Sequence, residues 1–160
     1  MTPVLIAYAT RTASARDVAL TAAETLRDAG HDVRVEDLKD KPTVDDAGFV
    51  ILGSGIHAGS WYPEATAWVA AHAQELQARG VAVFNTCLCV LDPAAREQGL
   101  GYNATAVQRT GAAFSESFAG RYVPARVGFL RRLLMRSMRK PAQDHFDPEA
   151  VRAWARSLSA

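Results

Sequence analysis

Apolar and polar residues follow one another along the chain in blocks that predict alternating strands and helices. Short, almost unbroken apolar runs are typical of strands buried on both faces of a parallel sheet, and the chain has them at residues 4–9, 49–53 and 81–86. Other segments have apolar side chains at helical spacing, and these are residues 13–29, 63–79 and 149–158.

The remaining segments complete an α/β pattern. Residues 31–36 alternate polar and apolar side chains, as an edge strand does, and residues 112–122 are predicted to form the last strand. A further helix is predicted at residues 102–111. Strand, loop and helix therefore alternate, which favours a doubly wound α/β sheet with right-handed crossovers. At 160 residues, the chain is predicted to be one domain spanning residues 1–160.

The first apolar run ends in a loop rich in hydroxyl groups that leads directly into a helix. Thr10, Thr12 and Ser14 supply three hydroxyls, and the first backbone N–H groups of the helix point into the same space. The positive end of the helix dipole favours an anion, so residues 10–15 are predicted to bind a phosphate group. The alternative is that Thr12 or Ser14 only caps the helix.

A second informative loop is predicted at residues 54–63, after the next buried run. Gly55 and Gly59 let a flat ligand approach the backbone closely, and Trp61 offers an aromatic face beside it. This loop therefore suits a planar ring. The alternative is that Trp61 packs under the following helix and the glycines only turn the chain.

Three loops are expected to meet at one edge of the sheet. They begin at Thr10, Ser54 and Thr86, each directly after or within a predicted buried strand. Ligands of doubly wound sheets lie outside the carboxyl ends of the strands. We therefore expect the three loops to converge on one ligand.

The amino-acid composition of the chain makes some classes of function less favoured than others. The chain is 49% hydrophobic and 22% charged with a net charge of +1, which does not favour nucleic-acid binding. Without a targeting segment or a membrane span of about 20 apolar residues, it is predicted to be cytoplasmic. The two cysteines, Cys87 and Cys89, are interpreted as buried small apolar residues rather than a disulfide, and no metal site is predicted.

Residues 121–140 have a different character, with seven basic side chains and no acidic one. A basic amphipathic helical insertion is predicted at about residues 124–140. Its apolar side and part of its basic face comprise Phe129, Leu130, Leu133, Leu134, Arg131, Arg132 and Arg136. Such a helix suits an anionic membrane surface or an apolar, acidic partner. The alternative is an ordinary core-packing helix with a solvated basic face.

With these loops located, the chain resembles flavodoxin-fold proteins, and specifically the flavodoxin-like protoporphyrinogen oxidase (menaquinone-dependent dehydrogenase) family. Residues 8–19 resemble that family's first phosphate loop, and residues 51–61 resemble its ring-flanking loop. Residues 121–122 and the basic helix resemble its insertion near the last strand. The resemblance implies a five-stranded parallel sheet of order 2-1-3-4-5 flanked by helices.

The resemblance also implies FMN as the cofactor, with its phosphate in the first loop and its ring between the other two. The implied cofactor-binding residues are Thr10, Arg11, Thr12, Ala13, Ser14, Ala15, Ser54, Gly55, Ile56, His57, Gly59, Trp61, Thr86, Cys87, Leu88 and Cys89. His57 is the candidate catalytic side chain, for proton handling beside the ring. Two positions depart from the family, because Ala13 replaces a glycine and Ala15 replaces a phosphate-binding hydroxyl.

Three functions are compatible with this pattern. The first is an FMN-dependent oxidoreductase that oxidises a porphyrinogen-like substrate and passes electrons to a quinone, at the inner face of the membrane. The second is a flavodoxin-like electron carrier that serves a redox partner. The third is a protein of this fold that has lost FMN and acts as a binding or accessory protein, which the two alanines favour.

Overall fold

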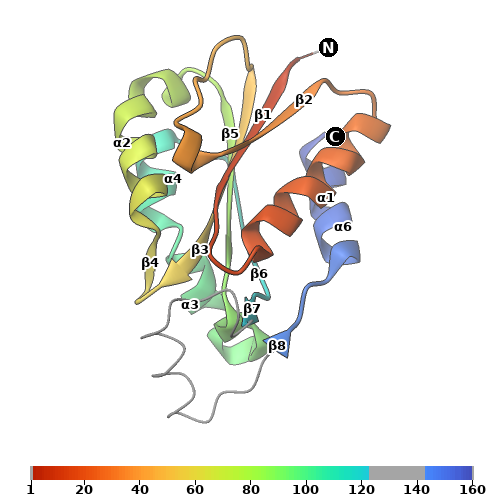
Figure 1. Cartoon of the computed structure of the whole chain (residues 1–160), viewed down its shortest axis with the longest axis vertical. Helices are drawn as coiled ribbons and strands as arrows, with labels where there is room; N and C mark the ends of the chain where they lie inside the picture. Colours follow the sequence, from red (N-terminus) through yellow and green to blue (C-terminus); the bar gives the residue numbers. More distant parts are fainter. Residues whose placement is uncertain (1, 123–142, 160) are drawn as a thin grey trace.

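The computed structural model describes residues 2–122 and 143–159. Within them, a six-stranded sheet has the order β2-β1-β3-β5-β6, and β4 pairs with β3 outside this path (Figure 1). The strands are β1 (Val4–Ala9), β2 (Val33–Asp37), β3 (Phe49–His57), β4 (Ser60–Trp61), β5 (Gly80–Thr86) and β6 (Phe114–Phe118).

The pairing of the strands confirms the predicted fold. Neighbours along the main path are all parallel, and only β4 runs antiparallel, against the end of β3. Numbered in chain order without β4, the parallel strands have the order 2-1-3-4-5. As its alternating pattern predicted, β2 lies at an edge of the sheet.

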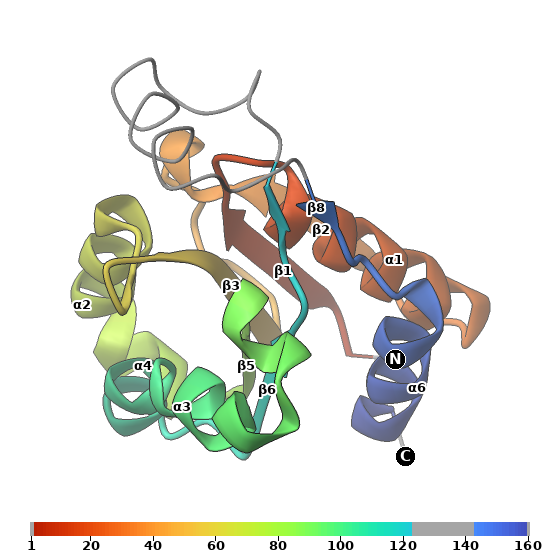
Figure 2. The ribbon, with the colours of Figure 1, turned by 90° about the horizontal axis from the view of Figure 1, so that it is seen from below.

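Helices cover both faces of the sheet, as Figure 2 shows. On one face lie α1 (Ser14–Asp28) and α6 (Pro148–Leu158), and on the other lie α2 (Pro63–Gln77) and α4 (Ala104–Thr110). The connection from β5 to α4 contains two short 3₁₀ segments and a short helix, namely η2 (Leu88–Leu91), η3 (Pro93–Ala95) and α3 (Arg96–Gly101). A further 3₁₀ turn, η1 (Leu38–Asp40), follows β2.

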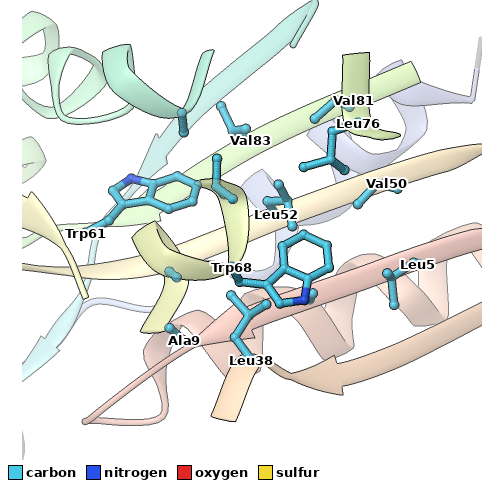
Figure 3. Packing of buried hydrophobic residues seen from close by; sticks show 14 of the residues in the cluster. Leu5, Ala9, Leu38, Val50, Leu52, Trp61, Trp68, Leu76, Val81 and Val83 are labelled. Carbon is cyan, nitrogen blue, oxygen red and sulfur yellow. The ribbon is translucent and has the colours of Figure 1, made fainter. Parts of the chain in front are cut away.

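The central strands bury side chains on both faces, which explains their unbroken apolar runs. Leu5 and Leu52 are fully buried on the α2 side, where Figure 3 shows them around Trp68. Ile6 and Ile51 are fully buried on the opposite side, under α1 and α6. Close packing on both faces fixes the strand ends, so the loops that leave them start from a rigid edge.

Two predicted segments have different boundaries in the structure. Residues 54–57, predicted as loop, continue β3, because β4 pairs with them through Ile56 and His57 to form a hairpin. The predicted last strand is also too long, since β6 ends at Phe118. The short strand β7 (Arg121–Tyr122) then pairs antiparallel with β8 (Gln143–Asp144).

The predicted basic helix at about residues 124–140 lies outside the described residues, with its apolar and basic side chains. In the part of the chain that the structure describes, no helix has the length and apolar character needed to span a bilayer.

Candidate functional site

The three loops singled out in the sequence begin at the same edge of the sheet. Because β1, β3 and β5 are parallel neighbours, Ala9 pairs with Ser54, and Ser54 pairs with Asn85. A hydrogen bond of 3.0 Å between the hydroxyls of Ser14 and Thr86 joins the first loop to the third. The loops at Thr10 and Thr86 therefore meet, as predicted for a ligand site at the carboxyl ends of the strands.

Helix α1 begins without a side-chain cap. Its N-cap residue is Ala13, and among the described residues the helix has no side-chain cap hydrogen bond. Thr12 and Ser14 instead bond each other through their hydroxyls at 3.2 Å. The capping alternative is therefore wrong, and within residues 2–122 and 143–159 no side-chain cap competes with a ligand anion at the start of α1.

Ala13 adopts the left-handed conformation, with φ of 66° and ψ of 2°. Glycine enters this region without penalty, whereas alanine is strained there. The loop thus keeps the backbone turn that a glycine supports, although the sequence has Ala13. Ala15 is fully buried in the core beside Val18, so it contributes only backbone groups to the loop.

The hydroxyl of Thr10 is the one polar group of this loop that is buried and unsatisfied. Among the described residues, its Oγ1 has no hydrogen-bond partner. Leaving a buried hydroxyl unpaired is costly, and such groups in folded proteins call for a ligand or another explanation. A phosphate oxygen accepting from Thr10 and from the N–H groups of α1 would satisfy this hydroxyl, so the residues of the loop fit a phosphate.

Arg11 is engaged elsewhere. Its guanidinium donates to both carboxylate oxygens of Glu64, at 2.5 and 2.9 Å, and lies 4.2 Å from the ring centroid of Tyr62. The hydrogen bond from Arg11 lowers the pKa of the Glu64 carboxyl, and the same bond raises the pKa of Arg11. Arg11 therefore links the phosphate loop to the first turn of α2 rather than standing free for an anion.

The predicted ring-flanking segment is a β3–β4 hairpin whose polar groups are largely used internally. Ser54 is fully buried; its Oγ donates to the Gly55 carbonyl at 2.7 Å and accepts from the Tyr62 N–H at 3.0 Å. A Cβ on Gly55 would lie 2.7 Å from the Tyr62 ring, so only glycine fits there. At the tip, Gly59 has φ of 75°, and His57 is exposed.

Trp61 is largely buried. Its indole Nε1 donates to the Asn103 side chain at 2.9 Å, and its ring belongs to the core on the α2 side (Figure 3). This placement matches the alternative in which Trp61 packs under the following helix. Ile56, which is partly buried, packs against the same core.

A buried polar network anchors the hairpin, and no pattern in the sequence indicated it. Asn103 accepts from Trp61 and, at 2.9 Å, from the side chain of Asn85. Asn85 also accepts from the Ser117 hydroxyl at 2.6 Å. Asn85 and Asn103 are both fully buried, so these bonds fix the hairpin relative to β5, β6 and the start of α4.

The third loop corrects the interpretation of the cysteines. Cys87 and Cys89 are joined by a disulfide, and both are partly exposed rather than buried. Leu88 between them is also partly exposed, whereas Thr86 before them is buried. The interpretation failed because it rested on the expected compartment, while the turn into η2 brings the two sulfurs together.

A cavity of about 200 Å³ lies beside the hairpin on the α4 side. Its lining includes Gly59, Trp61, Tyr102 and Arg109. It is smaller than the ~300–1,000 Å³ typical of small-molecule sites. Among the described residues, no group of three or more His, Cys, Asp or Glu side chains is placed to hold a metal ion.

Comparisons with known proteins agree with this geometry. A family model described as Flavodoxin domain matches residues 5–149. No curated protein matches the chain.

Solved structures show the fold. Oxidised flavodoxin 1 from Bacillus cereus is 15% identical with a TM-score of 0.64, and the match covers 99% of this chain and 97% of that one. A flavodoxin from Streptococcus pneumoniae TIGR4 is 16% identical with a TM-score of 0.63, and the match covers 99% of this chain and 98% of that one. Rubredoxin oxygen:oxidoreductase from Desulfovibrio gigas is 17% identical with a TM-score of 0.59; the match covers 99% of this chain but only 38% of that longer protein.

Proposed function

The chain belongs to the flavodoxin domain family, and on that premise we propose that it is an FMN-binding electron carrier. FMN is the cofactor that this membership supports. When bound, FMN supplies electron transfer in one- or two-electron steps. The observation that carries the proposal is the buried, unpartnered hydroxyl of Thr10 beside the uncapped start of α1.

The residues of the first loop have distinct tasks in this proposal. Thr10 and the first N–H groups of α1 would hold the phosphate of FMN, because together they supply donors and a positive dipole end. Ser14 and Thr86 hold the first and third loops together through their hydroxyls. Arg11 and Glu64 tie the phosphate loop to α2, which restricts its movement when the ligand is absent.

The remaining predicted site residues are proposed to act through the backbone or through packing. Ser54 and Gly55 shape the hairpin, and His57 lies at its exposed end. The buried network around Asn103 holds the hairpin in place through hydrogen bonds to Trp61 and Asn85. A fixed hairpin favours electron transfer because little of the protein has to reorganise.

Two observations support a carrier over an enzyme. The flavodoxins from Bacillus cereus and Streptococcus pneumoniae are matched over nearly their whole lengths, at 97% and 98%. In the longer rubredoxin oxygen:oxidoreductase, by contrast, this chain corresponds to 38% of the protein.

A protoporphyrinogen-oxidase-like enzyme is the second candidate. It rests on the basic, amphipathic sequence pattern at residues 121–140, which resembles that family's insertion. The porphyrinogen substrate, the quinone acceptor and contact with the membrane all depend on this candidate. Neither the family model nor the solved structures point to that activity.

The experiment that separates these functions follows flavin absorbance under anaerobic conditions. The FMN-loaded protein is first reduced by a flavodoxin reductase with NADPH and then mixed with oxidised cytochrome c. A carrier is reduced and reoxidised in this sequence and is not reduced by protoporphyrinogen. Rapid reduction by protoporphyrinogen would instead establish the second candidate, and failure to bind FMN at micromolar concentration would leave an accessory protein.

A further inference from the structure

The pair of cysteines after β5 is a chemical feature that the proposed carrier function does not use. Cys87 and Cys89 are the only cysteines of the chain, and a disulfide joins them. Their Cα atoms are 5.3 Å apart, within the range that a disulfide spans without moving the backbone. Both residues are partly exposed rather than buried in the core.

A structural role accounts poorly for this disulfide. Stabilisation by a disulfide grows with the length of the loop that it closes, and here the loop contains only the residues 87–89. The backbone is already held by other bonds, because Cys87 donates to the Phe118 carbonyl at 2.9 Å and accepts from Val90 at 3.4 Å. Exposed disulfides that add little stability belong to the labile, chemically active class.

The two sulfurs are not equivalent. The backbone N–H of Cys89 donates to the Sγ atom of Cys87 at 3.3 Å. A hydrogen bond to the charged form of a group favours that form, so the bond favours a thiolate at Cys87. In thiol–disulfide exchange the thiol with the lower pKa is the faster leaving group. Attack on Cys89, with departure of Cys87, is therefore the favoured direction.

We propose that Cys87 and Cys89 are a thiol–disulfide exchange site that accepts electrons from a dithiol. One thiolate of the dithiol attacks Sγ of Cys89, the bond between the two cysteine sulfurs breaks, and Cys87 leaves as a thiolate. The second thiolate of the dithiol attacks the mixed disulfide, releases Cys89 as a thiolate and closes the dithiol into a disulfide. Two electrons pass to the cysteine pair, and the two protons lost by the dithiol go to the new thiolates.

This site overlaps the candidate cofactor site, since Cys87 and Cys89 are among the residues predicted to bind FMN, but thiol exchange does not require the cofactor. The exchange steps involve only sulfur, and the pair begins directly after Thr86, the last residue of β5. The thiol-exchange proposal can therefore be tested independently of the FMN-binding proposal. It adds a second redox group of different chemistry at the same edge of the sheet.

The first test is a redox titration of the whole folded chain with mixtures of reduced and oxidised dithiothreitol. Samples are quenched with acid, labelled with a maleimide and weighed by intact-mass spectrometry. The proposal predicts one two-electron transition, from no adducts to two adducts per chain, without unfolding in far-ultraviolet circular dichroism. A disulfide that is reduced only after denaturation would overturn it, as would two thiols that stay free in excess oxidised glutathione.

The second test determines which sulfur is attacked. The oxidised chain is treated briefly with glutathione, quenched with acid and mapped by tandem mass spectrometry. The proposal predicts glutathione on Cys89, and glutathione found mainly on Cys87 would contradict the assigned direction. The matched variants Cys87→Ser and Cys89→Ser each retain one thiol and are expected to lose the two-electron transition entirely.

Discussion

Replacing Thr10 with valine should have opposite effects on the apoprotein and on FMN binding. Valine has nearly the shape of threonine but lacks the hydroxyl, and Oγ1 of Thr10 has no partner among the described residues. Removing a buried, unsatisfied hydroxyl relieves a penalty of ~1–3 kcal/mol, so the apoprotein should be unchanged or more stable. A gain of about 1 kcal/mol would raise Tm by roughly 2–4 °C in a chain of this size.

FMN binding should weaken in the same variant. A hydrogen bond to a charged group contributes about 1.5–3 kcal/mol, which corresponds to roughly a 10- to 150-fold loss of affinity. At an FMN concentration of about 100 times the wild-type Kd, the wild type gains about 2.7 kcal/mol of stability from the ligand. The variant should gain only about 0.3–1.4 kcal/mol under the same conditions.

The assay is urea unfolding of both proteins with and without FMN, combined with a fluorescence titration for Kd. Thr110→Val is the matched control, because the Thr110 hydroxyl is buried in α4 and donates to the Ala106 carbonyl at 2.7 Å. The control should lose about 1 kcal/mol of stability and keep its FMN affinity. If Thr10→Val loses stability as the control does, or binds FMN as tightly as the wild type, the reasoning about Thr10 is refuted.

Three further predictions concern the same edge of the sheet. Ala13→Gly should raise the free energy of unfolding by about 1 kcal/mol, because it relieves the strain of the left-handed backbone at this residue. The control Ala70→Gly within α2 should instead lower the free energy of unfolding by about 0.5–1 kcal/mol. Urea unfolding measures both variants, and an Ala13→Gly protein less stable than the wild type would count against the assigned strain. Because Arg11 lowers the pKa of Glu64, the ion pair's stabilisation is complete above the ordinary glutamate pKa of 4.5 and is lost as pH falls through the lower folded-state pKa. Unfolding measured from about pH 7 down to about pH 3 should therefore show a shallower loss of stability in Glu64→Gln, and parallel pH profiles would contradict the ion pair. Asn103→Ala should lower the free energy of unfolding by about 2–5 kcal/mol, because it leaves the side-chain N–H groups of Trp61 and Asn85 without this buried acceptor. A loss under about 1 kcal/mol in urea unfolding would show that the network does not anchor the hairpin.

The sheet could be predicted from the sequence because its signal is local. A parallel strand such as β1 is buried on both faces, so residues 4–9 are apolar almost without interruption. The edge position of β2 followed from its alternating pattern in the same way. These signals come from neighbouring residues and do not depend on distant partners.

The details of the candidate site depend instead on partners far apart in the sequence. Trp61 is buried because Asn103, 42 positions later, accepts its indole N–H. The Arg11 guanidinium is paired with the carboxylate of Glu64, 53 positions later, instead of being free to bind an anion. Neither pairing leaves a periodic or compositional trace, so the sequence could place the loops but not assign their side chains.

The disulfide between the two cysteines could not be predicted from the sequence for a different reason. β5 ends at Thr86, where its apolar run predicted, and the chain then turns into η2. That turn brings Cys87 and Cys89 close enough to form a disulfide. The interpretation of the cysteines rested on the expected compartment, which carries no information about this local turn.

The central claim is that residues 10–15 bind the phosphate group of FMN. The most direct measurement compares the Kd values of FMN and riboflavin for the whole chain by flavin fluorescence, since riboflavin has the same ring and lacks the phosphate. The phosphate should strengthen binding by about 10-fold or more, because it forms charge-assisted hydrogen bonds with the loop. Equal Kd values for the two flavins, or no binding of FMN at micromolar concentration, would contradict the claim.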